Sequence, residues 1–511
     1  MSQTFYVLLA LFGGLLYYLY LWGKKKHSYW AERGVKYVEP VPFFGQLLPV
    51  FLLKKGVGQV PLEIYRAYPN EKLVGYYNFT DPGVVVNDPE LIEKITIKDF
   101  QHFVDRPHFG LDEESVSSKA LFNLLGKEWR TARYKISPAF TTGKLKLTYQ
   151  TMDRCSDVLI ENIRKKTKNC EIKPLLVNYA IHTITTGVYG VEIKDEKTVK
   201  DFAEMADLLF FSGKLTIFRQ SFLRFFPKTS RFLGLKFFNG DCEEYFKFML
   251  ESTFEQRKHS KLHNNDFVDF LLKLKNKIKL EAIEKDSEDS YLNLDESGEI
   301  DTIEFTDQFI NGMAEQFILA GVLPLVQVAL YSMFELALHP DCQEKARKEV
   351  REVKEKHGGY TYAALKEMTY LDCCLSEIMR MHSLVENLER ICTKDYTTPD
   401  GLVIEKGTTV MIPIKEMIMD PKFFPNPDVF DPERFSQDSS IPSVFLPFGA
   451  GPRICIGMRY ANLQVKSALA KIIGSFSFKP GKGVGTKLIF GTLSFVPILQ
   501  NKIIIDFTPL E

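Results

Sequence analysis

The sequence lacks an excess of charge of either sign, and it lacks the paired-cysteine motifs of metal-binding and redox proteins. Its 511 residues carry 65 lysines and arginines against 65 aspartates and glutamates, so the formal net charge is zero. Nucleic-acid binding normally leaves a basic excess, and the balance argues against it. Eight cysteines occur without any C-x-x-C spacing, which argues against a zinc framework. This low density is typical of buried free thiols in a reducing compartment.

Internal repeats and low-complexity tracts are also missing. An apolar fraction of 45% is typical of a globular protein. The length of 511 residues allows one large domain or two to three ordinary ones. Helical periodicity dominates: 313–338 predicts a buried central helix, and 340–359 predicts an amphipathic surface helix that ends at two glycines. Strand-like runs at 73–79, 83–88 and 408–414 are short. The fold class is therefore mainly α with small β-sheets.

Charge is absent from the N-terminal run 4–22. Its 19 residues, at about 1.5 Å each in a helix, approach the roughly 30 Å of a bilayer's hydrocarbon core. Aromatic residues cluster at its end and three lysines follow, a pattern that keeps the body of the protein in the cytosol. A cleaved signal peptide is the alternative, although no small-residue cleavage site is evident. We predict a transmembrane anchor at 1–23, a basic and proline-rich hinge at 24–45, and one large domain at 46–511.

Two other segments have an unusual composition. Residues 286–301 are acidic and poor in apolar side chains, which predicts a solvated loop before the central helix. Residues 210–228 mix phenylalanine with arginine and lysine. This mixture suits a surface that lies against a membrane, and it suits a half-buried helix pair with a loop equally well.

One cysteine lies in a crowded loop, "FGAGPRICIG", at 448–457. A single soft thiolate is a good axial ligand for haem iron, and glycines let the backbone pass close to a flat macrocycle. The residues after Gly457 have a helical pattern, so Cys455 lies just before a helix N-terminus, whose N–H groups favour a thiolate. Arg453 places a cation near enough to meet a haem propionate.

Phe448, Gly451, Arg453, Cys455 and Gly457 fill the pattern F-x-x-G-x-R-x-C-x-G. This resembles the haem-binding loop of the cytochrome P450 superfamily. The resemblance covers nearly the whole chain, and its details are most similar to microsomal animal members, including the insect detoxification families. It implies the cytochrome P450 fold, with haem b held between the long central helix and the helix after the cysteine loop. It makes Cys455 the iron ligand and 46–511 a haem–thiolate catalytic domain.

The same family has an E-x-x-R helix motif, which Glu377 and Arg380 match here. In isolation this spacing is normally a surface pair worth a few tenths of a kcal/mol. The resemblance implies instead a structural ion-pair network, completed by Arg434 in "FDPERF", that fixes the scaffold behind the haem.

Further basic positions also match. The W-x-x-x-R of the family's third helix is Trp129 and Arg133, "DRPHFG" supplies Arg106 and "LERIC" supplies Arg390. Two propionates carry two negative charges, so several converging arginines make electrostatic sense. The resemblance implies that these residues bind the propionates together with the cysteine loop.

The central helix departs from the family pattern A/G-G-x-D/E-T-T. Ala320 and Gly321 match and leave room above the iron, but Leu323 replaces the acid and Pro324 the threonine. That acid–hydroxyl pair normally holds the water that delivers protons for O–O cleavage. Proline offers no N–H to the carbonyl of Ala320 and costs about 3 kcal/mol in a helix interior, which predicts a kink and a free carbonyl. The proton relay is then lost, or moved to backbone and water.

Glu315 and Gln316 lie one to two turns before Gly321. They are either a displaced acid or paired structural residues of a buried helix.

The resemblance implies a monooxygenase that oxidises a lipophilic small molecule with O2 and electrons from NADPH. Its expected partners are an NADPH–cytochrome reductase and cytochrome b5, on the cytosolic face of the endoplasmic reticulum membrane. Because of the altered central helix, two alternatives stay open: an isomerase or dehydratase that acts on a preformed peroxide, and a non-catalytic haem protein that binds a ligand. For the monooxygenase we expect low coupling, with much of the consumed NADPH recovered as hydrogen peroxide or superoxide.

Overall fold

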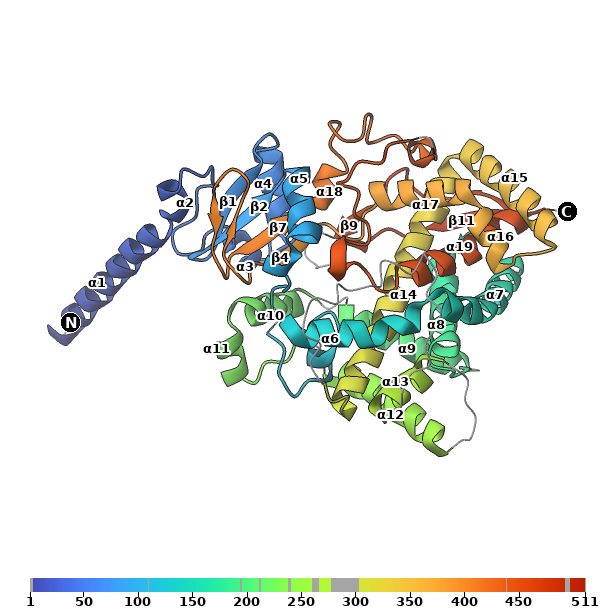
Figure 1. Cartoon of the computed structure of the whole chain (residues 1–511), viewed down its shortest axis with the longest axis horizontal. Coiled ribbons are helices and arrows are strands. Elements are labelled where there is room, and N and C mark those ends of the chain that lie inside the picture. The colour runs from blue at the N-terminus through green and yellow to red at the C-terminus, as the bar shows by residue number, and fades with distance from the viewer. Residues whose placement is uncertain are drawn as a thin grey trace.

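The computed structural model describes residues 3–108, 110–193, 195–210, 213–237, 240–259, 266–276, 303–437, 439–491 and 497–510. A long N-terminal helix projects from a body that consists of a small sheet lobe and a larger helical part (Figure 1). The acidic segment predicted as a loop at 286–301 lies outside the described residues.

Helices make up most of the described chain, in agreement with the predicted fold class. They are α1 (Gln3–Lys26), α2 (Tyr29–Glu32), α3 (Leu48–Phe51), α4 (Gln59–Ala67), α5 (Pro89–Glu93), α6 (Gly126–Ile136), α7 (Thr142–Lys165), α8 (Ile172–Gly187), α9 (Glu196–Phe210), α10 (Lys214–Phe225), α11 (Pro227–Phe232), α12 (Gly240–His259), α13 (Phe267–Lys275), α14 (Asp307–Leu338), α15 (Pro340–His357), α16 (Tyr362–Glu367), α17 (Thr369–Met381), α18 (Ile414–Met417) and α19 (Met458–Ser475). Short helical turns are η1 (Lys94–Lys98), η2 (Phe100–His102), η3 (Val116–Lys119), η4 (Ser137–Phe140), η6 (Pro432–Phe435) and η7 (Gly451–Arg453).

The strands are short and form small sheets. They are β1 (Leu73–Asn78), β2 (Asp81–Val86), β3 (Cys170–Glu171), β4 (Leu388–Ile391), β5 (Tyr396–Thr397), β6 (Val403–Ile404), β7 (Thr409–Ile412), β8 (Phe476–Pro480), β9 (Phe490–Gly491), β10 (Ile498–Leu499) and β11 (Ile504–Pro509). The largest sheet has the order β1-β2-β7-β4, and its β2–β7 pair is parallel. All three strand predictions are confirmed as β1, β2 and β7.

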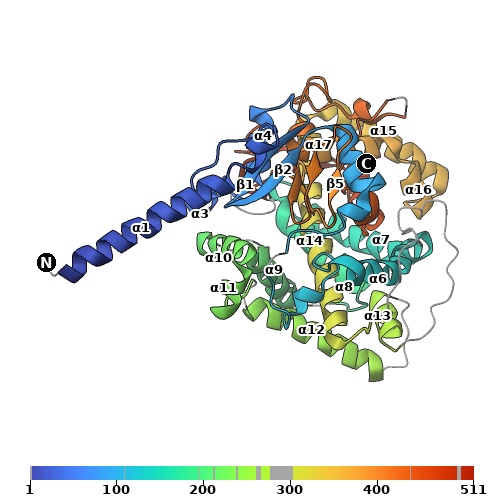
Figure 2. The ribbon, with the colours of Figure 1, turned by 60° about the vertical axis from the view of Figure 1, so that its left-hand side comes forward.

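Helix α14 is the predicted central helix. It is continuous over 32 residues, begins six residues earlier than the apolar run suggested, and contains Pro324 without a break. The hydroxyl of Thr306 accepts the N–H of Phe309 and so caps its first turn. Seen from two directions, α14 runs through the helical part behind α6 and α8 (Figures 1 and 2). It packs directly against α8, α17 and α19.

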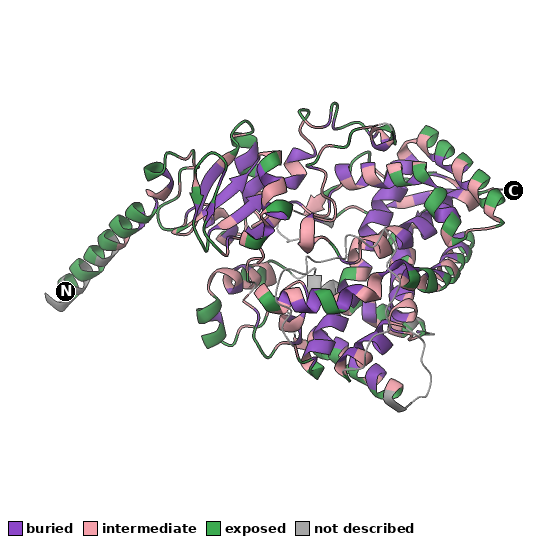
Figure 3. Ribbon diagram, in the orientation of Figure 1, coloured by how far each residue is buried: buried purple, intermediate pink, exposed green. Residues whose placement is uncertain are grey.

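Burial follows this arrangement, because the buried side chains concentrate on α14 and on the helix faces turned toward it (Figure 3). One large core cluster joins α7, α8, α14, α15, α17 and α19, while a second one around Trp30 and Val84 fills the sheet lobe. Surface helix α15 ends as predicted, with Gly358 in the left-handed conformation at φ 67°. The catalytic candidates therefore lie on elements anchored in the main core.

Among the described residues, α14 is the helix long and apolar enough to cross a bilayer, and 78% of its apolar window is buried inside the protein. It is a core helix. The N-terminal helix α1 is not singled out by the same criterion, but its side chains at Leu11, Phe12 and Tyr17 are more than half exposed.

Candidate active site

The cysteine loop is shaped by close backbone contacts. The N–H of Cys455 donates to the carbonyl of Phe448 at 2.9 Å, which closes the loop on itself. Gly451 has φ +64°, and a Cβ there would lie 1.8 Å from the carbonyl oxygen of Thr96, so only glycine fits against η1. At Gly457 an added Cβ would meet nothing within 4 Å. The backbone just after the thiol therefore borders open space.

Cys455 differs from the other seven cysteines, all of which are described, because it alone is exposed. Burial nevertheless raises the pKa of its thiol, while the N–H of Gly457 and the positive charges of Arg133 and Arg106 lower it. Protein atoms thus surround a thiol whose surface stays accessible. This combination describes a side chain that lines an internal hollow, and the two arginines and the N–H favour its thiolate form.

Arg453 is held rigidly beside the loop. Its Nε donates to the carbonyl of Val104 and its Nη2 to the carbonyl of Leu124, both at 2.9 Å. Its guanidinium lies 3.9 Å from the ring centroid of Trp129, on α6. Trp129 and Arg133 are one turn apart on this helix and are both buried.

Four arginines converge at this place: Arg106, Arg133, Arg390 and Arg453. Burial, together with the positive charges of Arg390 and Arg133, lowers the pKa of Arg106 to about 9. Burial also lowers the pKa of Arg390 to about 10. For Arg453, burial lowers the pKa well below its ordinary value, and the other three guanidinium groups act in the same direction.

Unpaired atoms in this cluster point to a missing anion. Nε and Nη2 of Arg390 and Nη1 of Arg453 are buried and have no partner among the described residues. Asp105 Oδ1 is 3.9 Å from Arg453 Nη2, whereas Glu389 is already paired with Arg224 at 2.7 Å. Buried cations without counter-charges are costly. An accessible interior thiol beside buried cations fits a flat group that carries two negative charges and takes one thiolate ligand, as haem does.

Glu377 lies at the centre of a buried ion-pair network behind the cysteine loop. Arg380 donates to its two oxygens from Nε and Nη2, at 2.7 and 2.9 Å, and both side chains are fully buried. Arg434 Nε lies 3.3 Å from Glu377 Oε1, and the N–H of Asp431 donates to the same oxygen at 3.0 Å. The remaining donors of Arg380 reach the carbonyls of residues 418 and 427. The network ties α17 to η6 and touches no reacting group.

On α14, Ala320 is exposed although the preceding turn of the helix is largely buried. As with Cys455, an exposed side chain on a core element indicates that it lines a hollow. At Gly321, an added Cβ would lie 2.3 Å from Cδ1 of Ile184 on α8. This glycine allows two helices to approach closely. Leu323 and Pro324, which replace the usual acid and threonine, are both half-buried.

Glu315 and Gln316 hold the segment after η3 against α14. The hydroxyl of Ser117 donates to Glu315 Oε2 at 2.8 Å, and Gln316 Oε1 accepts the N–H of Phe122 at the same distance. Burial raises the pKa of Glu315 to about 7. Their contacts agree with the structural interpretation of this pair.

Sequence reasoning missed the buried ion pair between Arg224 on α10 and Glu389 on β4. Both side chains are only 8% exposed. A motif search has no signal for it, because the two residues are 165 positions apart.

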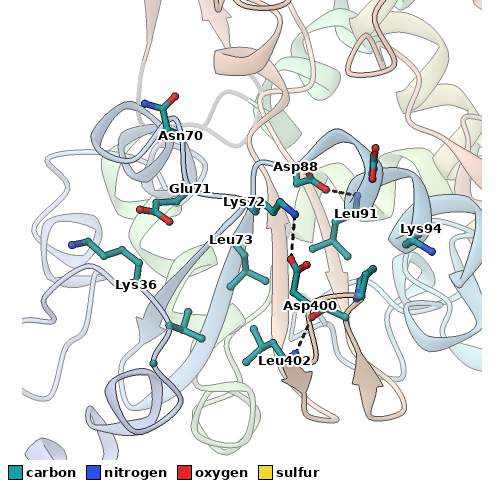
Figure 4. Close-up of a pocket in the computed structure, with 15 residues that line it drawn as sticks. Lys36, Asn70, Glu71, Lys72, Leu73, Asp88, Leu91, Lys94, Asp400 and Leu402 are labelled. Carbon is teal, nitrogen blue, oxygen red and sulfur yellow. Dashed lines mark hydrogen bonds and ion pairs between the residues drawn. The ribbon is translucent and has the colours of Figure 1, made fainter.

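A polar surface depression lies apart from the candidate active site. It lies in the sheet lobe near β1, α5 and the turn after β5, and its charged side chains include Lys72 and Asp400 (Figure 4). These two are 3.3 Å apart and largely exposed. None of the arginines described above, nor Cys455, lines it.

Comparison with known proteins agrees with this geometry. The family model described as Cytochrome P450 matches residues 36–505. Cytochrome P450 6k1 of Blattella germanica is 31% identical over 98% of this chain and 96% of its own length. Cytochrome P450 6B7 of Helicoverpa armigera is 33% identical over 94% of this chain and 94% of its own length. Cytochrome P450 6a2 of Drosophila melanogaster is also 33% identical, over 93% of this chain and 93% of its own length. The chain therefore belongs to the cytochrome P450 family. This membership implies haem–thiolate chemistry of the monooxygenase type, and the similar relatives are insect proteins.

Proposed function

We propose that this protein is a membrane-anchored haem–thiolate monooxygenase that oxidises a lipophilic small molecule. The balanced reaction is RH + O2 + NADPH + H⁺ → ROH + H2O + NADP⁺. The observation that carries the proposal is the accessible interior thiol of Cys455 beside buried Arg390 and Arg453, each of which has guanidinium nitrogens without a partner among the described residues. Family membership supports it independently.

Haem b, when bound, supplies the site that activates O2 with two electrons. Cys455 would hold the iron, while Phe448 and Gly457 shape the loop and leave its backbone accessible. The open space at Gly457 supports this placement. The group would then lie between α14 and α19, which pack against each other.

The propionates would be bound by Arg106, Arg133, Arg390 and Arg453. Trp129 orients this cluster by stacking on Arg453. Because guanidinium groups present several donors in a fixed plane, four of them fix the position of a dianion more firmly than lysines would.

On the oxygen side, Ala320 would leave room above the group, and Gly321 keeps α14 close to α8. Leu323 and Pro324 exclude water from positions where an acid and a hydroxyl normally hold it. The leucine and proline favour low coupling, and they also favour the alternative activity of an isomerase or dehydratase on a preformed peroxide, which needs no proton delivery to O2.

The domain boundaries proposed are an anchor at 1–23, a hinge at 24–45 and a catalytic domain at 46–511, on the cytosolic face of the endoplasmic reticulum. In both views α10 and α11 lie on the side of the body from which α1 projects (Figures 1 and 2). Leu215 on α10 is 82% exposed and Phe232 on α11 is 89% exposed. Apolar side chains at that exposure suit contact with the same membrane. The proposed electron donors are NADPH–cytochrome reductase and cytochrome b5.

Carbon monoxide difference spectra of the reduced protein test the thiolate. The wild-type chain is expected to give the far-red-shifted Soret band of thiolate-ligated iron, and Cys455→Ser is expected to lose it. Cys373→Ser is the matched control, because this half-buried thiol only donates to the carbonyl of Phe435 at 3.1 Å. A band that survives in Cys455→Ser would refute the assignment.

Turnover separates the activities. With a reductase, NADPH oxidation is measured across terpenoids, fatty acids and aromatic xenobiotics, and substrate-dependent oxidation is the expected result. Turnover of a fatty-acid hydroperoxide without NADPH would favour the isomerase instead. Silence in both assays, with spectral shifts on ligand binding, would favour a non-catalytic haem protein.

A further inference from the structure

Polar side chains follow one face of the C-terminal half of α14. Gln327, Tyr331 and Glu335 are four residues apart and continue the line of Ala320 and Pro324. Spacings of three and four residues place side chains on the same face of a helix. The surroundings are largely apolar, since this half of the helix is almost entirely buried in the main core. A polar stripe on such a helix needs a physical reason.

Two atoms of this stripe lack partners. Nε2 of Gln327 donates to the carbonyl of Pro497 at 2.7 Å, but Oε1 is buried and accepts from no described residue. The hydroxyl of Tyr331 is likewise buried without a described partner. Buried polar groups are almost always hydrogen-bonded, and ordered water is the usual partner where protein supplies none. Both atoms therefore mark sites suited to water.

The two side chains point along the helix in the same direction. Helical side chains lean toward the N-terminus, so Tyr331 covers the turn of Gln327, and Gln327 covers the turn of Pro324. At 1.5 Å per residue, successive members are about 6 Å apart along the axis, a gap that one bridging water spans.

The inner end of the stripe is a backbone carbonyl. Pro324 has no N–H, so the carbonyl of Ala320 cannot receive its normal helical hydrogen bond. Carbonyls in a helix point toward its C-terminus, here toward Gln327. Ala320 is also the exposed residue of α14 that borders the hollow. A free acceptor thus lies between the hollow and the stripe.

The outer end is a set of titratable groups that reaches the surface. His382 Nε2 lies 2.6 Å from Glu335 Oε1, and its ring centroid is 5.5 Å from that of Tyr331. His339 Nδ1 lies 2.8 Å from the backbone carbonyl oxygen of Glu335 and 3.5 Å from Glu335 Oε2, and its side chain is 38% exposed against 6% for Glu335. The partly exposed imidazole of His339 therefore lies between solvent and Glu335, and Glu335 in turn contacts His382.

We propose that this stripe is a proton path in which water held by Tyr331, Gln327 and the carbonyl of Ala320 relays protons from Glu335 and His382, with His339 at the outer end. It supplies the oxygen side of the site in place of the missing acid–hydroxyl pair, and it rests on the proposed monooxygenase function. The path moves protons only. The Tyr331 hydroxyl accepts one proton from the His382 side as it donates its own onward, so it gains no net charge, and NADPH supplies the electrons. Burial raises the pKa of Tyr331, which keeps this hydroxyl neutral.

The test uses Tyr331→Phe and Gln327→Leu in the haem-loaded, full-length protein. Ser332→Ala is the matched control, because it also removes a buried hydroxyl from α14, one that donates to the carbonyl of Val328 at 2.7 Å within the helix. The first readout needs no turnover. A high-resolution crystal structure of the resting protein is expected to show ordered water on Gln327 Oε1 and on the Tyr331 hydroxyl, and to lose it in Tyr331→Phe.

The second readout is the fraction of NADPH electrons recovered as hydrogen peroxide in the presence of a reductase. We expect this fraction to rise in Tyr331→Phe and Gln327→Leu while the fraction recovered as oxidised product falls at least twofold, and we expect both fractions to stay at the wild-type values in Ser332→Ala. Dry surroundings of Tyr331 in the crystal, or an unchanged peroxide fraction in both variants, would overturn the path. Failure of the monooxygenase proposal is distinguishable, because the wild-type protein would then show the thiolate Soret band without substrate-dependent NADPH oxidation by way of the reductase, or would show no such band.

Discussion

Substitution Glu377→Gln offers the sharpest test of the ion-pair network behind the cysteine loop. The carboxylate accepts four hydrogen bonds, two from Arg380, one from Arg434 and one from the N–H of Asp431, and its side chain is fully buried. Glutamine keeps the shape but removes the negative charge. The fully buried guanidinium of Arg380 then stays in the interior without a counter-charge, while Arg434 keeps only Asp431, at 4.0 Å.

Removal of one partner of a buried ion pair costs about 3 to 5 kcal/mol. Total unfolding free energies are typically about 5 to 15 kcal/mol, so Glu377→Gln should consume a large part of the stability. We expect much lower urea and thermal midpoints, together with a low ratio of haem to protein, because η6 and the cysteine loop lose their support.

Two further variants test whether the loss of stability in Glu377→Gln comes from the stranded positive charge. Glu352→Gln removes an exposed carboxylate that lies 4.0 Å from Lys348, and it should cost less than about 0.5 kcal/mol. The double variant Glu377→Gln/Arg380→Met removes the stranded cation and should regain part of the loss. If Glu377→Gln unfolds within about 1 kcal/mol of the wild type and keeps its haem, the network does not stabilise this fold as argued.

Three other outcomes can be checked in the same way. Arg224→Met leaves the carboxylate of Glu389 buried without its cation and should lower the free energy of unfolding in urea by about 3 kcal/mol. The double variant Arg224→Met/Glu389→Gln should lose less stability than the sum of the losses in the two single variants. Burial raises the pKa of Glu315 from 4.5 to about 7, so the carboxyl group loses its proton at a lower pH in the unfolded chain than in the folded protein. The free energy of unfolding should therefore fall as the pH rises from about 4.5 to about 7, and Glu315→Gln should abolish that fall in melting curves measured across this pH range. Gly451→Ala should prevent haem incorporation, because its Cβ would lie 1.8 Å from the carbonyl oxygen of Thr96; full incorporation would contradict the close packing of η1 on the loop.

The successful sequence predictions rest on patterns of residues that lie close together in the chain. Gly358 ends α15 because glycine tolerates the left-handed conformation, and a run of three consecutive valines identifies β2. The E-x-x-R spacing places Glu377 and Arg380 on one face of α17, a relation fixed by helix geometry alone.

Contacts between residues that lie far apart in the chain could not be predicted from the sequence. The pair of Arg224 and Glu389 joins elements 165 positions apart, and no local rule connects them. Gly321 was interpreted as clearance above the iron, but its contact with Ile184 is set by how α8 crosses α14. The unpaired atoms of Gln327 and Tyr331 likewise depend on which side of α14 faces the chain near Pro497.

The parallel pairing of β2 with β7 has a consequence for biosynthesis. Gly83 pairs with Thr409, so β2 cannot find its neighbour until 326 more residues have been made. At roughly 5 to 20 residues per second this takes about 16 to 65 seconds, while one edge of the β1–β2 hairpin stays unpaired. The loop around Cys455 emerges later still and must then settle on η1. The nascent chain therefore waits, with an open strand edge, for the segments that complete its sheet and the loop around Cys455. This interval is the stage at which the exposed edge most needs protection from pairing with other chains.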